Sequence, residues 1–144
     1  MAVTFDKIAY PEIEQGLLKI IDNEFKNVYI SPTFKMMGNE CIRIHLTTST
    51  SETLATNFEI RMYDVLVRYY LMGNIEDERT NEAIKRNVDR LRKHLIDNQV
   101  STTYNWAKLE IESIDYNVED EENEETDNLN IVEFSVDIQH YNQF

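Results

Sequence analysis

The sequence predicts a single α+β domain, in which a mostly antiparallel or mixed sheet of about four to five strands is flanked by two helices. In two segments, apolar residues recur at the three- and four-residue spacing of a helix. In most other segments they alternate with polar residues, as in strands. The segments follow the order helix, short strand, strand, long strand, helix, strand, strand. This order is typical of the α+β class.

Composition limits the kind of protein this can be. The chain has 144 residues, and 42% of them are hydrophobic, which is enough to bury a core in one domain. Three glycines and two prolines favour long regular elements over Gly- or Pro-rich linkers. No stretch reaches the roughly 18 apolar residues of a membrane span, and the N-terminus lacks the pattern of a signal peptide. With Cys41 as the single cysteine, no internal disulfide forms, so we expect a soluble intracellular domain.

The first half of the chain begins with an amphipathic helix over residues 10–25, and Pro11 fits its first turn. A short β-prone run over 27–31 follows. Residues 41–50 alternate as a half-buried strand, and the polar run that starts at Thr47 is expected to continue as an exposed loop.

A long extended segment over 53–71 follows this loop. Its apolar residues change parity between Met62 and Val65, which predicts either a β-bulge near Tyr63 and Asp64 or a strand that leaves one surface for another.

A second helix over 76–97 has acidic residues at its start and basic residues near its end, as the helix dipole favours. Its narrow apolar stripe consists of Ile84, Val88, Leu91 and Leu95. We expect this stripe to pack on the sheet through Ile42, Ile44, Phe134 and Val136.

Two further strands over 104–118 and 129–141 complete the domain, which spans residues 1–144. Between them, seven of the nine residues 119–127 are acidic. Because such a block cannot pack in a core, we expect a solvated hairpin loop over 119–128.

The charge is strongly negative and unevenly distributed. The formal net charge is −13, and residues 98–144 hold 12 acids and one base, whereas residues 1–97 hold 15 acids and 13 bases. A chain this acidic repels nucleic acid. Two interpretations stay open: the acids serve solubility, or they form a surface that DNA passes without sticking.

The sequence contains no pattern typical of catalysis. His45, His94 and His140 are scattered, and none has another histidine or cysteine at metal-ligand spacing. No phosphate-binding or nucleophile motif occurs, and the acidic segment lacks the glycine and glutamate that an EF-hand loop requires. We therefore expect no enzyme activity, no cofactor and no metal site.

Several patterns over nearly the whole chain point to one family. They are Ile20-Ile-Asp22, Val28-Tyr-Ile30, Phe58-Glu-Ile-Arg61, the stripe helix from Ile84 to Leu95, Leu109-Glu-Ile111, the acidic hairpin and Val132-Glu-Phe-Ser-Val136. In this order they resemble the tail terminator (tail completion, minor tail protein U-like) family of tailed bacteriophages and its neck-protein relatives.

This resemblance implies a structural virion protein that is assembled in the host cytoplasm and located in the tail or neck. The expected assembly is a homohexameric ring that caps the tail tube and meets the head–tail connector or stopper protein. DNA would pass through the ring without specific binding, and no membrane is involved. Two alternatives stay open: another neck, head-completion or tail-tube subunit, and an acidic protein that mimics DNA. A tube subunit needs a long stacking loop, for which only the polar run 47–53 is available.

Two sets of candidate residues follow from the ring hypothesis. Acids that line the passage would repel DNA, and the candidates are Asp115, Glu119, Asp120, Glu121, Glu122, Glu133 and Asp137. A ring also needs a head-to-tail interface, where aromatic and basic residues are favoured. The interface candidates are Tyr63, Tyr69, Tyr70, Arg86, Arg90 and Lys93.

Overall fold

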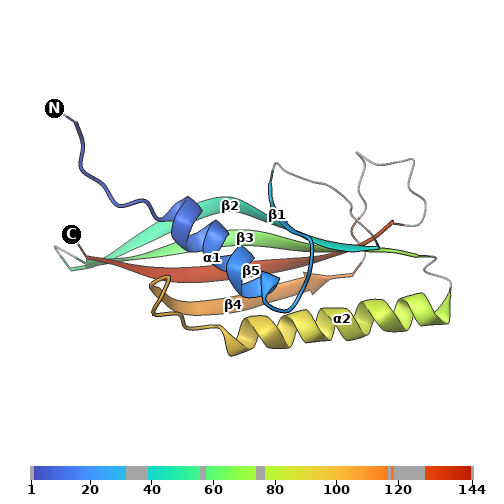
Figure 1. The fold of residues 1–144 in the computed structure, drawn as a ribbon. Coiled ribbons are helices and arrows are strands. Elements are labelled where there is room, and N and C mark those ends of the chain that lie inside the picture. The colour runs from blue at the N-terminus through green and yellow to red at the C-terminus, as the bar shows by residue number, and fades with distance from the viewer. Residues whose placement is uncertain are drawn as a thin grey trace.

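The computed structural model describes residues 2–31, 39–55, 58–73, 77–116, 118 and 129–143. In this part the chain forms one mixed sheet with two α-helices, the first of which continues a short π-helical segment. This confirms the predicted α+β class (Figure 1). The helical segments are η1 (Ala9–Glu14), which has π-helical geometry, α1 (Gln15–Asp22), which continues it, and α2 (Glu78–Asp97). The strands are β1 (Val28–Ile30), β2 (Glu40–Ala55), β3 (Phe58–Met72), β4 (Trp106–Asp115) and β5 (Leu129–Gln143).

The sheet has the order β1-β2-β3-β5-β4. Only β1 and β2 are parallel, and every other neighbouring pair is antiparallel. Strands β3 and β5 pair without interruption from Phe58 opposite Gln143 to Met72 opposite Leu129. This long central pair sets the register of the whole sheet.

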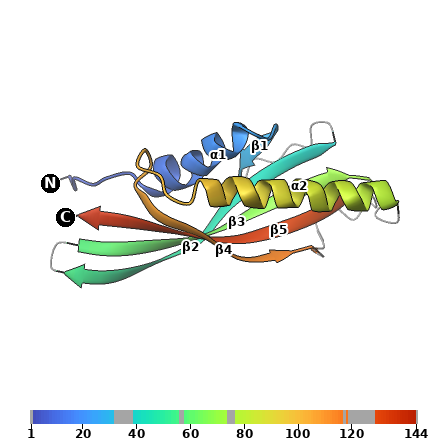
Figure 2. The same cartoon turned by 90° about the horizontal axis from the view of Figure 1, so that it is seen from below.

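Both helices pack against the same face of the sheet (Figure 2). The alternation along β3 and β5 turns one set of side chains towards the helices, and these side chains form one core with the apolar sides of α1 and α2. On the other face, called here the helix-free face, the buried described residues form a small cluster of Cys41, Tyr70 and Ile131, against which Tyr29, Val118 and Leu129 pack. Within the described residues, no helix is long and apolar enough to cross a membrane.

The stripe of α2 is buried as predicted. Ile84, Val88, Leu91 and Leu95 belong to the same core as their four expected partners, Ile42, Ile44, Phe134 and Val136. The helix starts at Asp77, whose carboxylate accepts a hydrogen bond from the backbone N–H of Arg79.

The expectation of an exposed loop starting at Thr47 is wrong. The side chains of residues 47–52 are exposed, but β2 continues to Ala55 because its backbone pairs with β3, from Thr48 opposite Asp64 to Thr53 opposite Glu59. Threonine-rich segments are favoured in strands, and this pairing satisfies the backbone donors and acceptors.

The bulge predicted near Tyr63 lies on the neighbouring strand instead. β3 pairs with β5 without a bulge, and the register shift occurs in β2 between Leu46 and Thr48. A second shift, between Ile111 and Ser113 in β4, explains why the apolar parity changes there. Its extra residue returns Ile114 to the helix-covered face.

Glu12 joins the first helical segment to strands β4 and β5. Its backbone carbonyl accepts a hydrogen bond from Trp106 Nε1 at 2.9 Å, and its carboxylate lies 2.6 Å from Nε2 of the buried His140. Gly16 lies against the same wall, where an added Cβ would stand 3.0 Å from the ring of Tyr104. Any larger residue would push α1 away from β4.

Substitution of Leu91 by alanine tests this core. Leu91 is fully buried in the middle of the stripe, so we expect Leu91→Ala to lower the free energy of unfolding by about 2–5 kcal/mol. Chemical denaturation measures the loss, with the exposed neighbour Arg92→Ala as a control that should change stability by less than about 0.5 kcal/mol. Equal, small losses in both variants would mean that the stripe does not face the core.

Candidate functional site: acidic side chains on the helix-free face

The register of the sheet gathers carboxylates on the helix-free face. Asp64 in β3 lies opposite Asp137 in β5, and Asp137 lies opposite Glu110 in β4. Four residues before Asp137 in β5, Glu133 lies opposite Asp115 in β4. Glu112 is the extra residue at the register shift in β4. We call the whole group the acidic face: Asp64, Glu110, Glu112, Asp115, Glu133 and Asp137.

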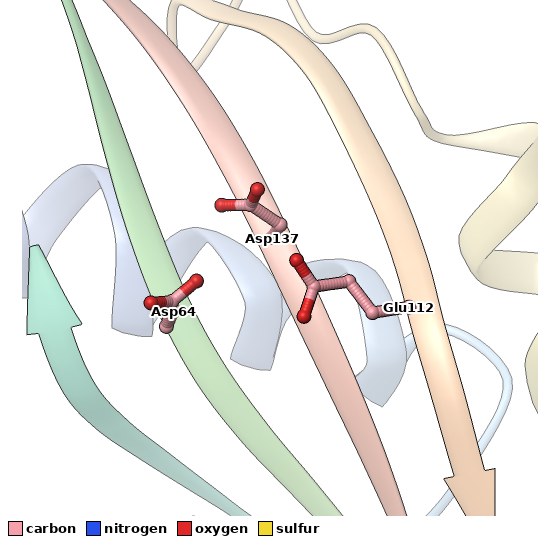
Figure 3. A group of neighbouring side chains, drawn as sticks. All are labelled: Asp64, Glu112 and Asp137. Atoms are coloured by element: carbon pink, nitrogen blue, oxygen red, sulfur yellow. The ribbon is translucent and has the colours of Figure 1, made fainter. Parts of the chain in front are cut away.

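Three of these carboxylates meet in one place. One carboxylate oxygen each from Asp64, Glu112 and Asp137 lies within 4.8 Å of the others. Figure 3 shows the three side chains, which come from the adjacent strands β3, β4 and β5. Glu112 belongs to this group because the register shift between Ile111 and Ser113 turns it towards β5.

Like charges this close cannot all ionise freely. Burial and the charges of Asp64, Glu112 and Glu110 raise the pKa of Asp137 from 3.8 to about 6, and a hydrogen bond with Asp64 adds to this effect. Asp64 accepts a second hydrogen bond at 2.6 Å, from the hydroxyl of Thr48. Asp137 therefore takes up a proton as the pH falls through about 6, and the protonated carboxyl can donate it to Asp64.

The same oxygens could also ligate a hard cation, since carboxylates suit Ca²⁺ and Mg²⁺. Each carboxylate offers one oxygen at the shared point, so further oxygens would have to complete the six to eight ligands that Ca²⁺ takes. A proton on Asp137 relieves its repulsion with Asp64, while Asp137 Oδ1 is buried without a hydrogen-bond partner among the described residues.

Of the seven candidate passage acids, the structure brings together Asp115, Glu133 and Asp137. Asp115 is exposed, whereas Glu133 accepts a hydrogen bond from Arg68 Nε at 2.7 Å, with side chains 33% and 20% exposed for the arginine and the glutamate. The other four candidates, Glu119, Asp120, Glu121 and Glu122, lie outside the described residues, as does the predicted hairpin loop.

The other three acids of this face, Asp64, Glu110 and Glu112, were not among the predicted passage residues. Asp64 carries a signal, because it is a lone charge in an otherwise apolar stretch of β3. Glu110 and Glu112 alternate with apolar residues, which is also the pattern of ordinary solvent-facing residues. Only the register of three strands shows that these acids converge.

The three tyrosines proposed for an interface lie inside the subunit, which corrects that proposal. Tyr63, Tyr69 and Tyr70 are each at most 2% exposed. The hydroxyl of Tyr69 donates to the carboxylate of Glu40 and accepts a hydrogen bond from Asn87 at 2.9 Å, so it joins β2, β3 and α2. Partners from two other elements allow the tyrosine to be buried.

The basic interface candidates all lie on α2, and two of them have partners within the subunit. Arg90 bonds the backbone carbonyl and the carboxylate of Glu24 and covers the ring of Phe25. Lys93 pairs with Asp97 one turn away. Arg86 is exposed and is the remaining candidate for contact with another molecule.

The histidines and the cysteine occupy structural positions. His94 Nε2 lies 2.6 Å from the carbonyl of Ile20, His140 pairs with Glu12, and His45 is exposed. Burial raises the pKa of the Cys41 thiol to about 11, so it stays protonated at neutral pH.

No family model and no curated protein sequence matches this chain.

The raised pKa of Asp137 predicts a pH-dependent stability. The stabilising contribution of the protonated carboxyl is complete below about pH 4 and is lost as the pH rises through about 6, because the unfolded chain has the ordinary pKa of 3.8. Asparagine imitates the protonated acid at every pH. We expect Asp137→Asn to be more stable than the natural protein by about 1–2 kcal/mol at pH 7, with allowance for solvent screening, and equal to it at pH 4.

Urea denaturation at both pH values measures this difference. The exposed Asp115→Asn serves as the control, and its stability should follow that of the natural protein across the range. The prediction is contradicted if the difference in stability between Asp137→Asn and the natural protein is the same at pH 7 as at pH 4. This carboxyl would then ionise normally.

Proposed function

We propose that this chain is a structural subunit of a tailed bacteriophage, a tail terminator whose identical copies form a ring between the tail tube and the head connector. The observation that supports this proposal most strongly is the acidic face. The same strands carry two basic residues on this face, Arg68 and Lys108, and each is paired with one of the six carboxylates. The acids therefore exceed the bases, and a face with this excess repels duplex DNA, whereas unpaired basic residues there would each bind a phosphate.

The distribution of charge over the two faces agrees with a subunit that has an inside and an outside. The exposed side of α2 carries more bases than acids. The six bases are Arg79, Lys85, Arg86, Arg90, Arg92 and Lys93, and the four acids are Glu78, Glu82, Asp89 and Asp97. The helices cover the face opposite the acids. In the proposed ring, the acidic face is turned to the DNA passage and α2 is turned away from it.

One alternative is weakened by a particular observation. A tail-tube subunit needs a long stacking loop, and the run proposed for it belongs to strand β2 as far as Ala55. A DNA mimic shares the acidic face, so the experiment must separate it from the ring.

Genome release from reconstituted particles tests the proposal. Glu110→Lys/Glu112→Lys reverses two exposed charges of the acidic face, and Glu82→Lys/Asp89→Lys reverses two exposed charges on α2. Both variants gain affinity for free DNA, since any cluster of lysines attracts phosphates. We expect only the first to slow genome release, and this effect should weaken at high salt because charges are screened within about 10 Å at 0.1 M.

Equal release rates for the two variants would contradict a passage lined by the acidic face. A natural protein that stays monomeric in sedimentation at high concentration and in assembly mixtures would contradict the ring itself. If that monomer also inhibited host DNA-binding enzymes, the mimic would be the better account.

A further inference from the structure

A pocket of ≈ 680 Å³ lies between the N-terminal segment and the β2–β3 ribbon. Phe5, Tyr10, Leu46 and Tyr63 supply apolar atoms to its lining, and Arg61 supplies a guanidinium. Small-ligand sites commonly have volumes of about 300–1,000 Å³, mostly apolar walls and a few polar groups that fix orientation. The pocket belongs to the helix-covered side of the sheet, since Arg61 shares the parity of Tyr63.

Arg61 is unusual among the three arginines of the described strands. Arg43 donates to the hydroxyl of Ser31 at 3.0 Å, and Arg68 donates to Glu133 at 2.7 Å. Within the described part of the chain, the Arg61 side chain has no hydrogen bond and no ion pair, and its Nε is shielded from solvent. The side chain is half-buried, but its Nε has lost contact with water and has no acceptor, which is costly. The structure therefore calls for an acceptor at this nitrogen.

The charges around Arg61 favour an anion. Lys7 and Asp6 both line the pocket, and with Arg61 they leave it one positive charge in a chain of net charge −13. A guanidinium matches the planar, two-oxygen geometry of a carboxylate or the oxygens of a phosphate. The neighbouring aromatic and aliphatic side chains suit an anion that carries a small apolar body.

We propose that this pocket is an oxyanion-binding site in which Arg61 holds a carboxylate or phosphate group. The group comes either from a small molecule in solution or from an acidic side chain of a second copy of this chain. The site is separate from the acidic face, and its existence does not depend on the proposed ring.

Titration calorimetry with benzoate and with inorganic phosphate tests binding of a free anion. We expect saturable binding of at least one of them to the natural protein, and binding that is at least about tenfold weaker in Arg61→Gln. Arg79→Gln, which removes an exposed arginine at the start of α2, is the matched control and should bind as the natural protein does.

Sedimentation of the same proteins without added anion tests the second source. If a second copy supplies the carboxylate, Arg61→Gln associates only at about tenfold higher concentration than Arg79→Gln, and benzoate or phosphate weakens association of the natural protein. Either result supports the site.

The site is refuted if Arg61→Gln and Arg79→Gln behave alike in both experiments. Should Arg61→Gln fail to fold, the Arg61 Nε–H resonance of the natural protein decides the question. It must shift on titration with an anion or on self-association, and a resonance unchanged in both would overturn the proposal.

Discussion

Packing of both helices against one side of the sheet is the constraint on which the rest of this structure depends. The two helices and the alternating apolar residues of β3 and β5 share a single core, so the opposite parity of the same strands faces away from it. Polar and charged residues are tolerated there because they keep access to water or to one another. The acidic face is therefore a consequence of where the helices pack, together with the identity of the residues at every second position.

Much of this architecture can be predicted from the sequence, because it follows from local periodicity. The stripe of α2 and the alternation of β5 are strong patterns, and both elements lie where these patterns indicate. The limits of β2 are harder to predict, because a run of threonine and serine is compatible with a loop or with a strand. Pairing with β3 decides between them, and that pairing is a tertiary property.

The convergence of Asp64, Glu112 and Asp137 could not be predicted in the same way. It requires the register of β3 against β5 and one extra residue in β4. Both depend on how separate strands pair, so the residues of one strand do not determine them. The burial of Tyr69 is a similar case, since its hydroxyl depends on Glu40 and Asn87, which are distant in sequence. Arg61 becomes distinctive only through tertiary structure, because its side chain has no hydrogen bond or ion pair among the described residues.

The central claim is that identical copies of this chain close into a ring with the acidic face towards the opening. Electron cryo-microscopy of the assembled natural protein tests it most directly. The account predicts a closed ring in which the β3–β5 face surrounds the central passage and α2 lies away from it. A ring whose passage is lined by α2, or a preparation that contains only single subunits, would contradict the account.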